Sequence, residues 1–181
     1  MSKIFPALVA VILIALPIPA LAQFKAKVGE DVERFGLKEL APDAAQPAKT
    51  VFLDEVIGRD ATGKAKVVWI SFFASWCHSC RKEFPSLGRV RKLFKPTEFE
   101  VIAVNVGEDP ETVFSFAGAP DFPVLFDRDS QAMARWPVKG LPTTLVVDRQ
   151  GRLALRAVGG REFDDPAIVE QLRELLMPRS T

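Results

Sequence analysis

Residues 67–80 read VVWISFFASWCHSC, and this stretch decides the fold. Its first seven residues are an almost continuous β-branched and aromatic run, which predicts a strand buried on both faces. A helix is expected to begin directly after Cys77, because apolar residues recur downstream at helical spacing. These residues are Phe84, Leu87, Val90, Leu93 and Phe94.

The rest of the chain continues this alternation of strands and helices. Further strands are predicted at 99–106, 122–126, 143–147 and 153–158, and helices at 130–136 and after Asp109-Pro110 and Asp165-Pro166. In both Asp-Pro pairs the aspartate suits a helix cap and the proline the first turn. The last two strands flank a turn-rich connection and are expected to form an antiparallel hairpin. The pattern predicts an α/β domain with a mixed sheet.

The N-terminal segment has the composition of an export signal. Lys3 precedes an uncharged apolar run from Ile4 to Ala22, which closes on Ala20-Leu21-Ala22. A short positive start, an apolar core and a small-x-small ending are typical of a secretory signal peptide, with cleavage expected after Ala22. An uncleaved membrane anchor is the alternative, because the run is almost long enough to span a bilayer. Both interpretations place the domain outside the cytoplasm, in the periplasm or an equivalent compartment.

Length and charge suggest one domain without a nucleic-acid partner. The 181 residues divide into the segment 1–22, an N-terminal arm at 23–49 and a domain at 50–181. Lys and Arg number 24 and Asp and Glu 23, and Lys3 is the charged residue of the leader, so the processed chain has no net charge. A nucleic-acid-binding domain would be expected to carry a clustered basic face.

The two cysteines, Cys77 and Cys80, are poorly explained as a structural staple. A disulfide that closes so short a loop gains little chain-entropy stabilisation. A structural zinc site needs four Cys or His ligands, whereas the whole chain has two Cys and one His. Attached haem requires His directly after the second Cys, where Arg81 stands. The pair is therefore interpreted as a redox site that needs no metal and no cofactor.

Their placement gives the two cysteines different roles. Cys77 is expected at the helix N-terminus, where unpaired N–H groups and the helix dipole favour an anion. The thiolate is the attacking species, and the pKa of the first cysteine in such motifs falls to roughly 3.5–7.5. Cys80, three residues later, lies on the same helical face within the first turn. Cys77 should therefore attack a disulfide of the partner, and Cys80 should resolve the mixed disulfide.

Two motifs together resemble a known family. FFASWCHSCRKEFP at 72–85 and KGLPTTLVVD at 139–148 are similar to the periplasmic TlpA/ResA-like branch of the thioredoxin superfamily, over about residues 50–177. The resemblance implies a thioredoxin-like fold, with a mixed central sheet and helices on both faces. It also implies a cis peptide bond before Pro142, whose loop should face Cys77 and offer the backbone of Leu141 to a client peptide. An ordinary loop proline is the alternative.

Glu83 is the third catalytic candidate. Thioredoxin carries a buried acid on its central strand, and the matching residue here is Ser71; the resembling branch instead carries a glutamate at the position of Glu83. A carboxylate one turn below Cys80 can accept the Cys80 proton, and partial burial should raise its pKa. The alternative is a solvated glutamate in the charged run 81–83.

Three neighbours of the cysteines have weaker assignments. His78 and Ser79 stand between them and are expected to tune the reduction potential, with a solvent-facing His78 as the alternative. Trp76 is assigned to the partner surface or, alternatively, to the core.

The expected function is reduction of disulfides in exported clients, by a monomer that receives electrons from a membrane thiol donor. The resemblance implies apocytochrome c and copper-site proteins as clients. Oxidase or isomerase activity would use the same residues, because direction depends on the reduction potential relative to the compartment. A Cu(I) metallochaperone is a weaker alternative: two thiolates suit Cu(I), but no histidine lies outside the motif. Peroxidase activity is disfavoured by the position of Cys77 at a CxxC helix start.

Overall fold

The computed structural model describes residues 29, 31–33, 36–39, 49–55, 57 and 66–177. The predicted leader 1–22 lies outside these residues, as does most of the predicted arm 23–49. No helix within the described ranges is long and apolar enough to cross a membrane.

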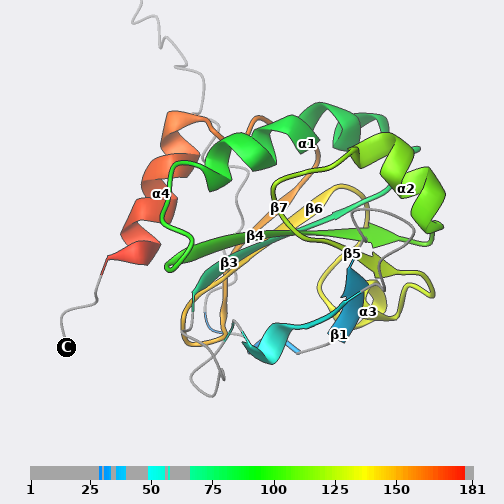
Figure 1. Cartoon of the computed structure of the whole chain (residues 1–181). Helices are drawn as coiled ribbons and strands as arrows, with labels where there is room; N and C mark the ends of the chain where they lie inside the picture. Colours follow the sequence, from blue (N-terminus) through cyan, green and yellow to red (C-terminus); the bar gives the residue numbers. More distant parts are fainter. Residues whose placement is uncertain are drawn as a thin grey trace, which may run out of the picture.

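The described strands form one mixed sheet in the order β2-β1-β5-β4-β3-β6-β7. β3 pairs in parallel with β4 and antiparallel with β6, so it is an interior strand of the sheet (Figure 1). The seven strands are β1 (Gly36–Glu39), β2 (Thr50–Phe52), β3 (Val67–Phe73), β4 (Phe99–Val106), β5 (Val124–Asp127), β6 (Thr143–Val147) and β7 (Leu153–Val158).

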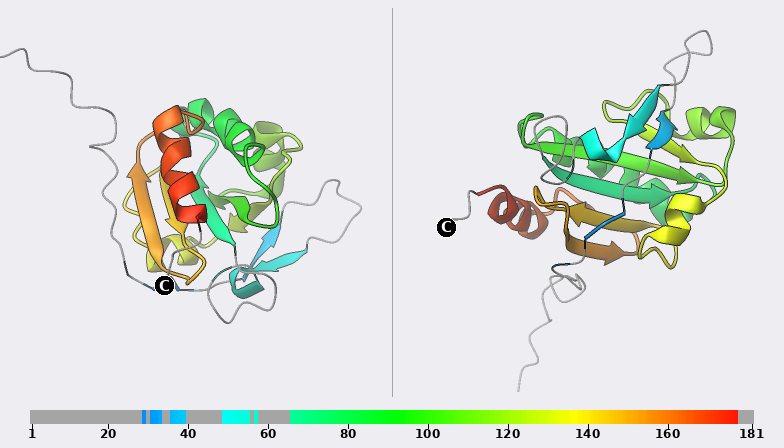
Figure 2. Two further views of the ribbon diagram at one scale, coloured as in Figure 1. Left: turned by 90° about the vertical axis from the view of Figure 1, so that its left-hand side faces the viewer. Right: turned by 90° about the horizontal axis from the view of Figure 1, so that it is seen from below.

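Four α-helices and a short 3-10 helix cover the sheet. α1, α2 and α4 lie over one face, and α3 lies on the opposite side (Figures 1 and 2). The helices are α1 (His78–Arg91), α2 (Pro110–Ala117), α3 (Gln131–Arg135) and α4 (Pro166–Leu176), with the 3-10 helix at Leu53–Glu55. The predicted mixed sheet with helices on both faces is confirmed. The bounds of β3, β4, β6 and β7 equal the predicted ones, and those of β5 and α3 differ by one or two residues, which is usual at fraying ends.

Strand β3 divides its side chains between two cores, which explains its continuous hydrophobic run. Val67, Trp69 and Phe73 belong to the cluster beneath α1 and α4. Val68, Ile70 and Phe72 belong to the cluster on the α3 side. Because side chains alternate along a strand, Ser71 shares the α1 side with Trp69 and Phe73. A polar residue thus lies directly under the helix that carries the cysteines.

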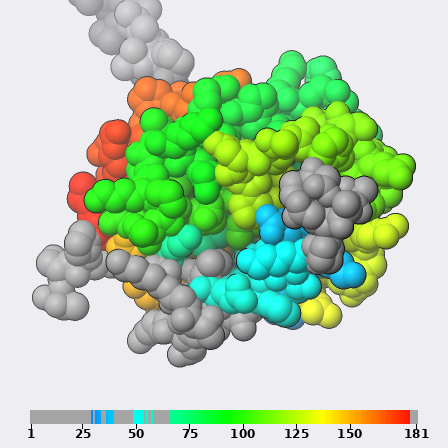
Figure 3. All heavy atoms as spheres, in the orientation of Figure 1, coloured from blue at the N-terminus to red at the C-terminus, as the bar shows by residue number. Residues whose placement is uncertain are grey.

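Helices α1 and α2 lie side by side above the sheet (Figure 1), and their green and yellow-green surfaces adjoin in the space-filling view (Figure 3). Aromatic rings join the two helices. The ring centroids of Phe84 and Phe116 are 5.1 Å apart, and Phe73 of β3 stacks on Phe116 at 5.4 Å. The predicted cap of α2 is present: the side chain of Asp109 accepts the N–H of Thr112 at 2.9 Å, and Pro110 occupies the first turn. These contacts fix the start of α1 over the end of β3.

The sheet extends into the stretch interpreted as an arm. Within 23–49, residues Gly36–Glu39 form β1, which pairs antiparallel with both β2 and β5. The strand has only four residues, GLKE, which is too short for an alternation of polar and apolar residues to predict it from the sequence. β1 and the short β2 close the sheet at the edge opposite β7.

Candidate active site

The segments that form the site lie together at one end of the strands. β3 and β4 are parallel, so the residues that follow both strands meet at the same end. β6 is antiparallel to β3, and β7 is antiparallel to β6, which brings the start of β6 and the end of β7 to this end as well. Cys77 follows β3, Glu108 follows β4, Pro142 precedes β6 and Gly159 follows β7.

Cys77 and Cys80 form a disulfide at the start of α1. Cys77 occupies the N-cap position, and its Sγ accepts the backbone N–H of Cys80 at 3.2 Å. A residue at this position normally supplies an oxygen acceptor to the free N–H groups of the first turn. A sulfur there receives the same N–H groups, which favour negative charge on it after reduction.

The two cysteines differ slightly in solvent exposure, and the residues beside them in the sequence are more exposed than either. Cys80 is fully buried, whereas Cys77 is 6% exposed. Ser79 places its Oγ 3.5 Å from the Cys77 Sγ. His78 is exposed to solvent. Trp76 is 73% exposed, so the alternative of a core tryptophan is wrong.

The peptide bond between Leu141 and Pro142 is cis, as the resemblance implied. The carbonyl of Pro142 accepts the N–H of Gly159 at 3.0 Å, which ties this loop to the end of β7. Leu141 is half-buried and packs against the hydrophobic cluster that contains both cysteines. The loop before β6 therefore lies at the same end of the strands as the start of α1.

Glu83 is a buried acid rather than a solvated helix residue. Its side chain is 1% exposed, and Ser71 of β3 donates its hydroxyl to Oε1 at 3.1 Å. Thr144 of β6 contacts the same hydroxyl at 3.5 Å. Burial raises the pKa of Glu83 to about 8, and the Ser71 hydrogen bond and Arg161 lower it by less. The predicted burial of this carboxyl is confirmed, and the alternative of a solvated glutamate is wrong. Ser71 of β3 and Glu83 of α1 lie in direct contact.

The buried carboxyl predicts a stability that depends on pH. The pKa of Glu83 is about 8 in the folded protein, against an ordinary value of 4.5. The folded state therefore holds a proton that the unfolded state has lost, and stability should fall as pH rises from about 4.5 to about 8. The loss expected from this separation is on the order of 5 kcal/mol.

The measurement is urea unfolding of the oxidised protein at pH 5 and pH 9, compared with Glu83→Gln. Because glutamine carries no titrating proton, the variant should lose less stability over this interval than the wild type. Glu174→Gln, at an exposed glutamate of α4, serves as the control that keeps the wild-type profile. Equal losses in the wild type and Glu83→Gln would mean that the carboxyl ionises as freely as in solution.

A second acid, Glu108, fixes the loop before Cys77 and was missed in the sequence. Its carboxylate accepts the backbone N–H of Ser75 at 2.7 Å, the Ser75 hydroxyl, and the side-chain amide of Asn105 at 2.6 Å. Arg81 donates to the Ser75 carbonyl at 3.0 Å and lies 5.4 Å from the ring of Phe116. The adjacency of β3 and β4 could have predicted this contact, because residues that follow parallel neighbours meet at one end of the strands.

The segment after β7 was also missed. A Cβ on Gly160 would lie 2.6 Å from the carbonyl oxygen of Ser79, so only glycine allows this backbone to approach the residues between the cysteines. Arg161 lies beyond it, and its charge acts on Glu83. No local sequence signal marks these residues, because their position depends on how β7 packs.

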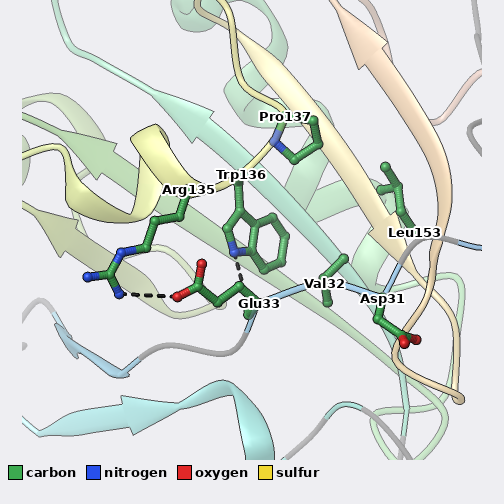
Figure 4. Close-up of a pocket in the computed structure, with 7 residues that line it drawn as sticks. All are labelled: Asp31, Val32, Glu33, Arg135, Trp136, Pro137 and Leu153. Atoms are coloured by element: carbon green, nitrogen blue, oxygen red, sulfur yellow. Dashed lines mark hydrogen bonds and ion pairs between the residues drawn. The ribbon is translucent and has the colours of Figure 1, made fainter.

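A separate surface pocket lies on the α3 side (Figure 4). The indole nitrogen of Trp136 donates to the backbone carbonyl of Glu33 at 2.8 Å, and Arg135 pairs with the Glu33 carboxylate at 3.3 Å. Residues that line it are Asp31, Val32, Glu33, Arg135, Trp136, Pro137 and Leu153. None of the predicted site residues is among them.

Comparison with known proteins agrees with this geometry. Residues 28–156 match the model of the AhpC/TSA family. The thiol-disulfide oxidoreductase ResA of Bacillus subtilis is 37% identical over 120 residues, which cover 65% of each chain. ResA of Geobacillus thermodenitrificans is 28% identical over 149 residues, covering 80% of this chain and 84% of its own. The match to the B. subtilis protein thus spans just under two thirds of that relative.

A solved structure has the same fold over nearly its whole length. A thiol:disulfide interchange protein of the DsbE type from Chlorobium tepidum superposes with a TM-score of 0.70 at 29% identity. The superposition covers 84% of this chain and 99% of the other. The predicted thioredoxin-like fold is therefore confirmed.

Proposed function

Because the chain belongs to the AhpC/TSA family, within the thioredoxin superfamily, we propose that it is a thiol–disulfide oxidoreductase that reduces disulfides of exported client proteins. The observation that carries the proposal is the Cys77–Cys80 disulfide at the N-terminus of α1. A cysteine pair in this position exchanges readily between dithiol and disulfide, because the helix start stabilises the thiolate of the first cysteine. The similarity to ResA supports the same chemistry.

The reaction has two displacement steps. In the reduced protein the thiolate of Cys77 attacks one sulfur of a client disulfide, forms a mixed disulfide and releases the other client sulfur as a thiolate. Cys80 then loses its proton and attacks the Cys77 sulfur, which releases the second client thiolate and forms the Cys77–Cys80 disulfide. Two electrons pass from the cysteine pair to the client.

Glu83 is assigned as the base for the second step. It lies one turn from Cys80 on α1 and is 1% exposed. Its pKa, raised to about 8 by burial, is close to that of an ordinary thiol, so the proton can pass from sulfur to carboxylate near neutral pH. Ser71 holds the accepting carboxylate by donating to Oε1 at 3.1 Å.

The client is proposed to bind around Trp76, Leu141 and Pro142. Trp76 offers a largely exposed aromatic surface directly before the attacking cysteine. The backbone of Leu141, beside the cis bond, would pair with an extended client segment in the manner of an added strand. His78 and Ser79 are proposed to tune the potential from their positions between the cysteines.

The proposed setting is extracytoplasmic, and the proposed direction is reduction. The composition of residues 1–22 supports export or anchoring, and similarity to the reductive branch supports a reductant supplied by a membrane thiol donor. Apocytochrome c and copper-site proteins are the client classes proposed from the same resemblance. The protein is proposed to act as a monomer.

The reduction potential of the Cys77–Cys80 pair tests the direction. Titration against glutathione or dithiothreitol should give a midpoint nearer the value of about −270 mV of thioredoxin than the value of about −120 mV of the strong periplasmic oxidant. A midpoint above about −180 mV would contradict the reductant and assign the same residues to an oxidase or isomerase.

A further inference from the structure

One side of α1 is covered by the segment 160–164, which joins β7 to α4 (Figure 1). Ser79, Glu83, Ser86 and Arg89 follow one another at spacings of four, three and three, so they lie on one side of the helix. Ser79, Ser86 and Arg89 contact the segment. The segment therefore runs along the helix rather than away from it.

The three contacts between α1 and the segment are a close backbone approach, a hydrogen bond and an ion pair. The backbone of Gly160 lies so near Ser79 that a Cβ would stand 2.6 Å from the Ser79 carbonyl oxygen. The N–H of Phe163 donates to the Ser86 hydroxyl at 3.0 Å, and the Arg89 guanidinium donates to Asp164 at 2.7 Å. The segment is thus anchored at three points along α1. Glu83 lies between the first two of these points in the sequence and is 1% exposed.

Arg161 is the residue of the segment that acts on Glu83. Its positive charge and its backbone N–H both lower the pKa of the carboxyl, against the larger effect of burial. The guanidinium donates to the Val158 carbonyl at 3.3 Å, which holds it against the end of β7. Of the groups around the carboxyl, Cys80 comes from α1, and Ser71 and Thr144 contribute hydroxyls from β3 and β6. Among the described residues, Arg161 is the one whose charge acts there.

We propose that Arg161 is a positioning residue for Glu83: the anchored segment 160–164 holds its guanidinium where it stabilises the ionised carboxylate, the form that accepts the Cys80 proton. This inference rests on the proposed role of Glu83. A buried carboxylate without a nearby cation stays protonated and cannot act as a base. The proton moves from the Cys80 sulfur to the Glu83 oxygen, and Arg161 neither gives nor receives one.

Direct titration of Glu83 in the oxidised protein tests this inference without turnover. The carboxyl carbon is followed by NMR in protein carrying ¹³C-labelled glutamate, and Glu83→Gln identifies its signal. The cysteines are paired in this state, so they do not titrate alongside it. Arg161→Gln should raise the pKa of Glu83 above the wild-type value by on the order of one pH unit, because a cation is lost. Arg161→Lys retains the charge and should stay close to the wild type.

A matched control and a kinetic arm complete the test. Arg128→Gln, at an exposed arginine, should leave the titration unchanged. Arg161→Gln should also slow resolution at pH 7, with the rate recovering as pH rises, and should have no such effect in a Glu83→Gln background.

The inference is overturned if Arg161→Gln leaves the Glu83 titration at its wild-type position, or if Arg161→Lys moves it as far as Arg161→Gln does. A wild-type protein that reduces no disulfide would contradict the proposed function instead, and the titration would still report on Arg161.

Discussion

Cys77→Ser is expected to lower the rate of client-disulfide reduction to that of the uncatalysed reaction. Cys77 provides the sulfur at the N-cap of α1, where backbone N–H groups favour the thiolate. A serine hydroxyl is not ionised near neutral pH and does not exchange with disulfides. The measurement is the turnover of a model peptide disulfide with dithiothreitol as the electron donor.

Cys80→Ser should fail at a different step. Cys77 can still attack, but no second thiol is present to resolve the product, so a mixed disulfide with the client should accumulate in stoichiometric amount. Mass spectrometry of the intact protein detects it as an increase by the mass of one client peptide. A stable adduct in Cys77→Ser and none in Cys80→Ser would exchange the roles of the two cysteines.

Glu83→Gln should slow resolution while leaving the first attack almost unchanged. Glutamine keeps the size and the hydrogen bond to Ser71 but cannot take up the proton of Cys80. Loss of a positioned acid or base typically costs roughly 10²–10⁴-fold in the step that it serves. The expected decrease lies within this range, with the larger values where the wild-type carboxylate is ionised.

Stopped-flow reduction of a model disulfide across about pH 5 to 9 separates the two steps, since this window brackets the ordinary thiol and carboxyl values. In the wild type, resolution should accelerate as pH rises toward about 8, the pKa to which burial raises Glu83. The apparent titration belongs to the coupled Glu83–Cys80 pair and should disappear in Glu83→Gln. Glu174→Gln, on α4, provides an exposed matched control. Superimposable profiles for the wild type and Glu83→Gln would remove Glu83 from the mechanism.

The sequence predicted the central part of the fold well because β3, β4 and the flanking helices have strong local patterns. Val67–Phe73 is buried at every position, and both Asp-Pro pairs begin helices as expected. β1 was not predicted, because a four-residue strand at the side of a sheet carries little periodicity of its own. Its stability comes from pairing with β2 and β5.

The site was predictable where it is continuous in sequence and not where tertiary packing assembles it. Cys77, Cys80 and Glu83 lie within two turns of one helix, so spacing and resemblance identified them together. The contact of Glu83 with Ser71 follows from alternation on β3, once α1 is known to cover that face. Arg161 and Gly160 reach α1 only through the path of the chain after β7, which no short-range pattern specifies.

The most direct test of the central claim, that Cys77 is the attacking thiol of this site, is pulsed alkylation of the reduced wild-type protein. A limiting pulse of iodoacetamide at neutral pH, followed by unfolding, labelling with a heavy reagent and peptide mapping, gives the relative reactivity of the two cysteines. Cys77 should carry most of the first label, because it lies at the helix N-terminus and Cys80 is fully buried. Faster labelling of Cys80, or equal labelling of both, would contradict the account.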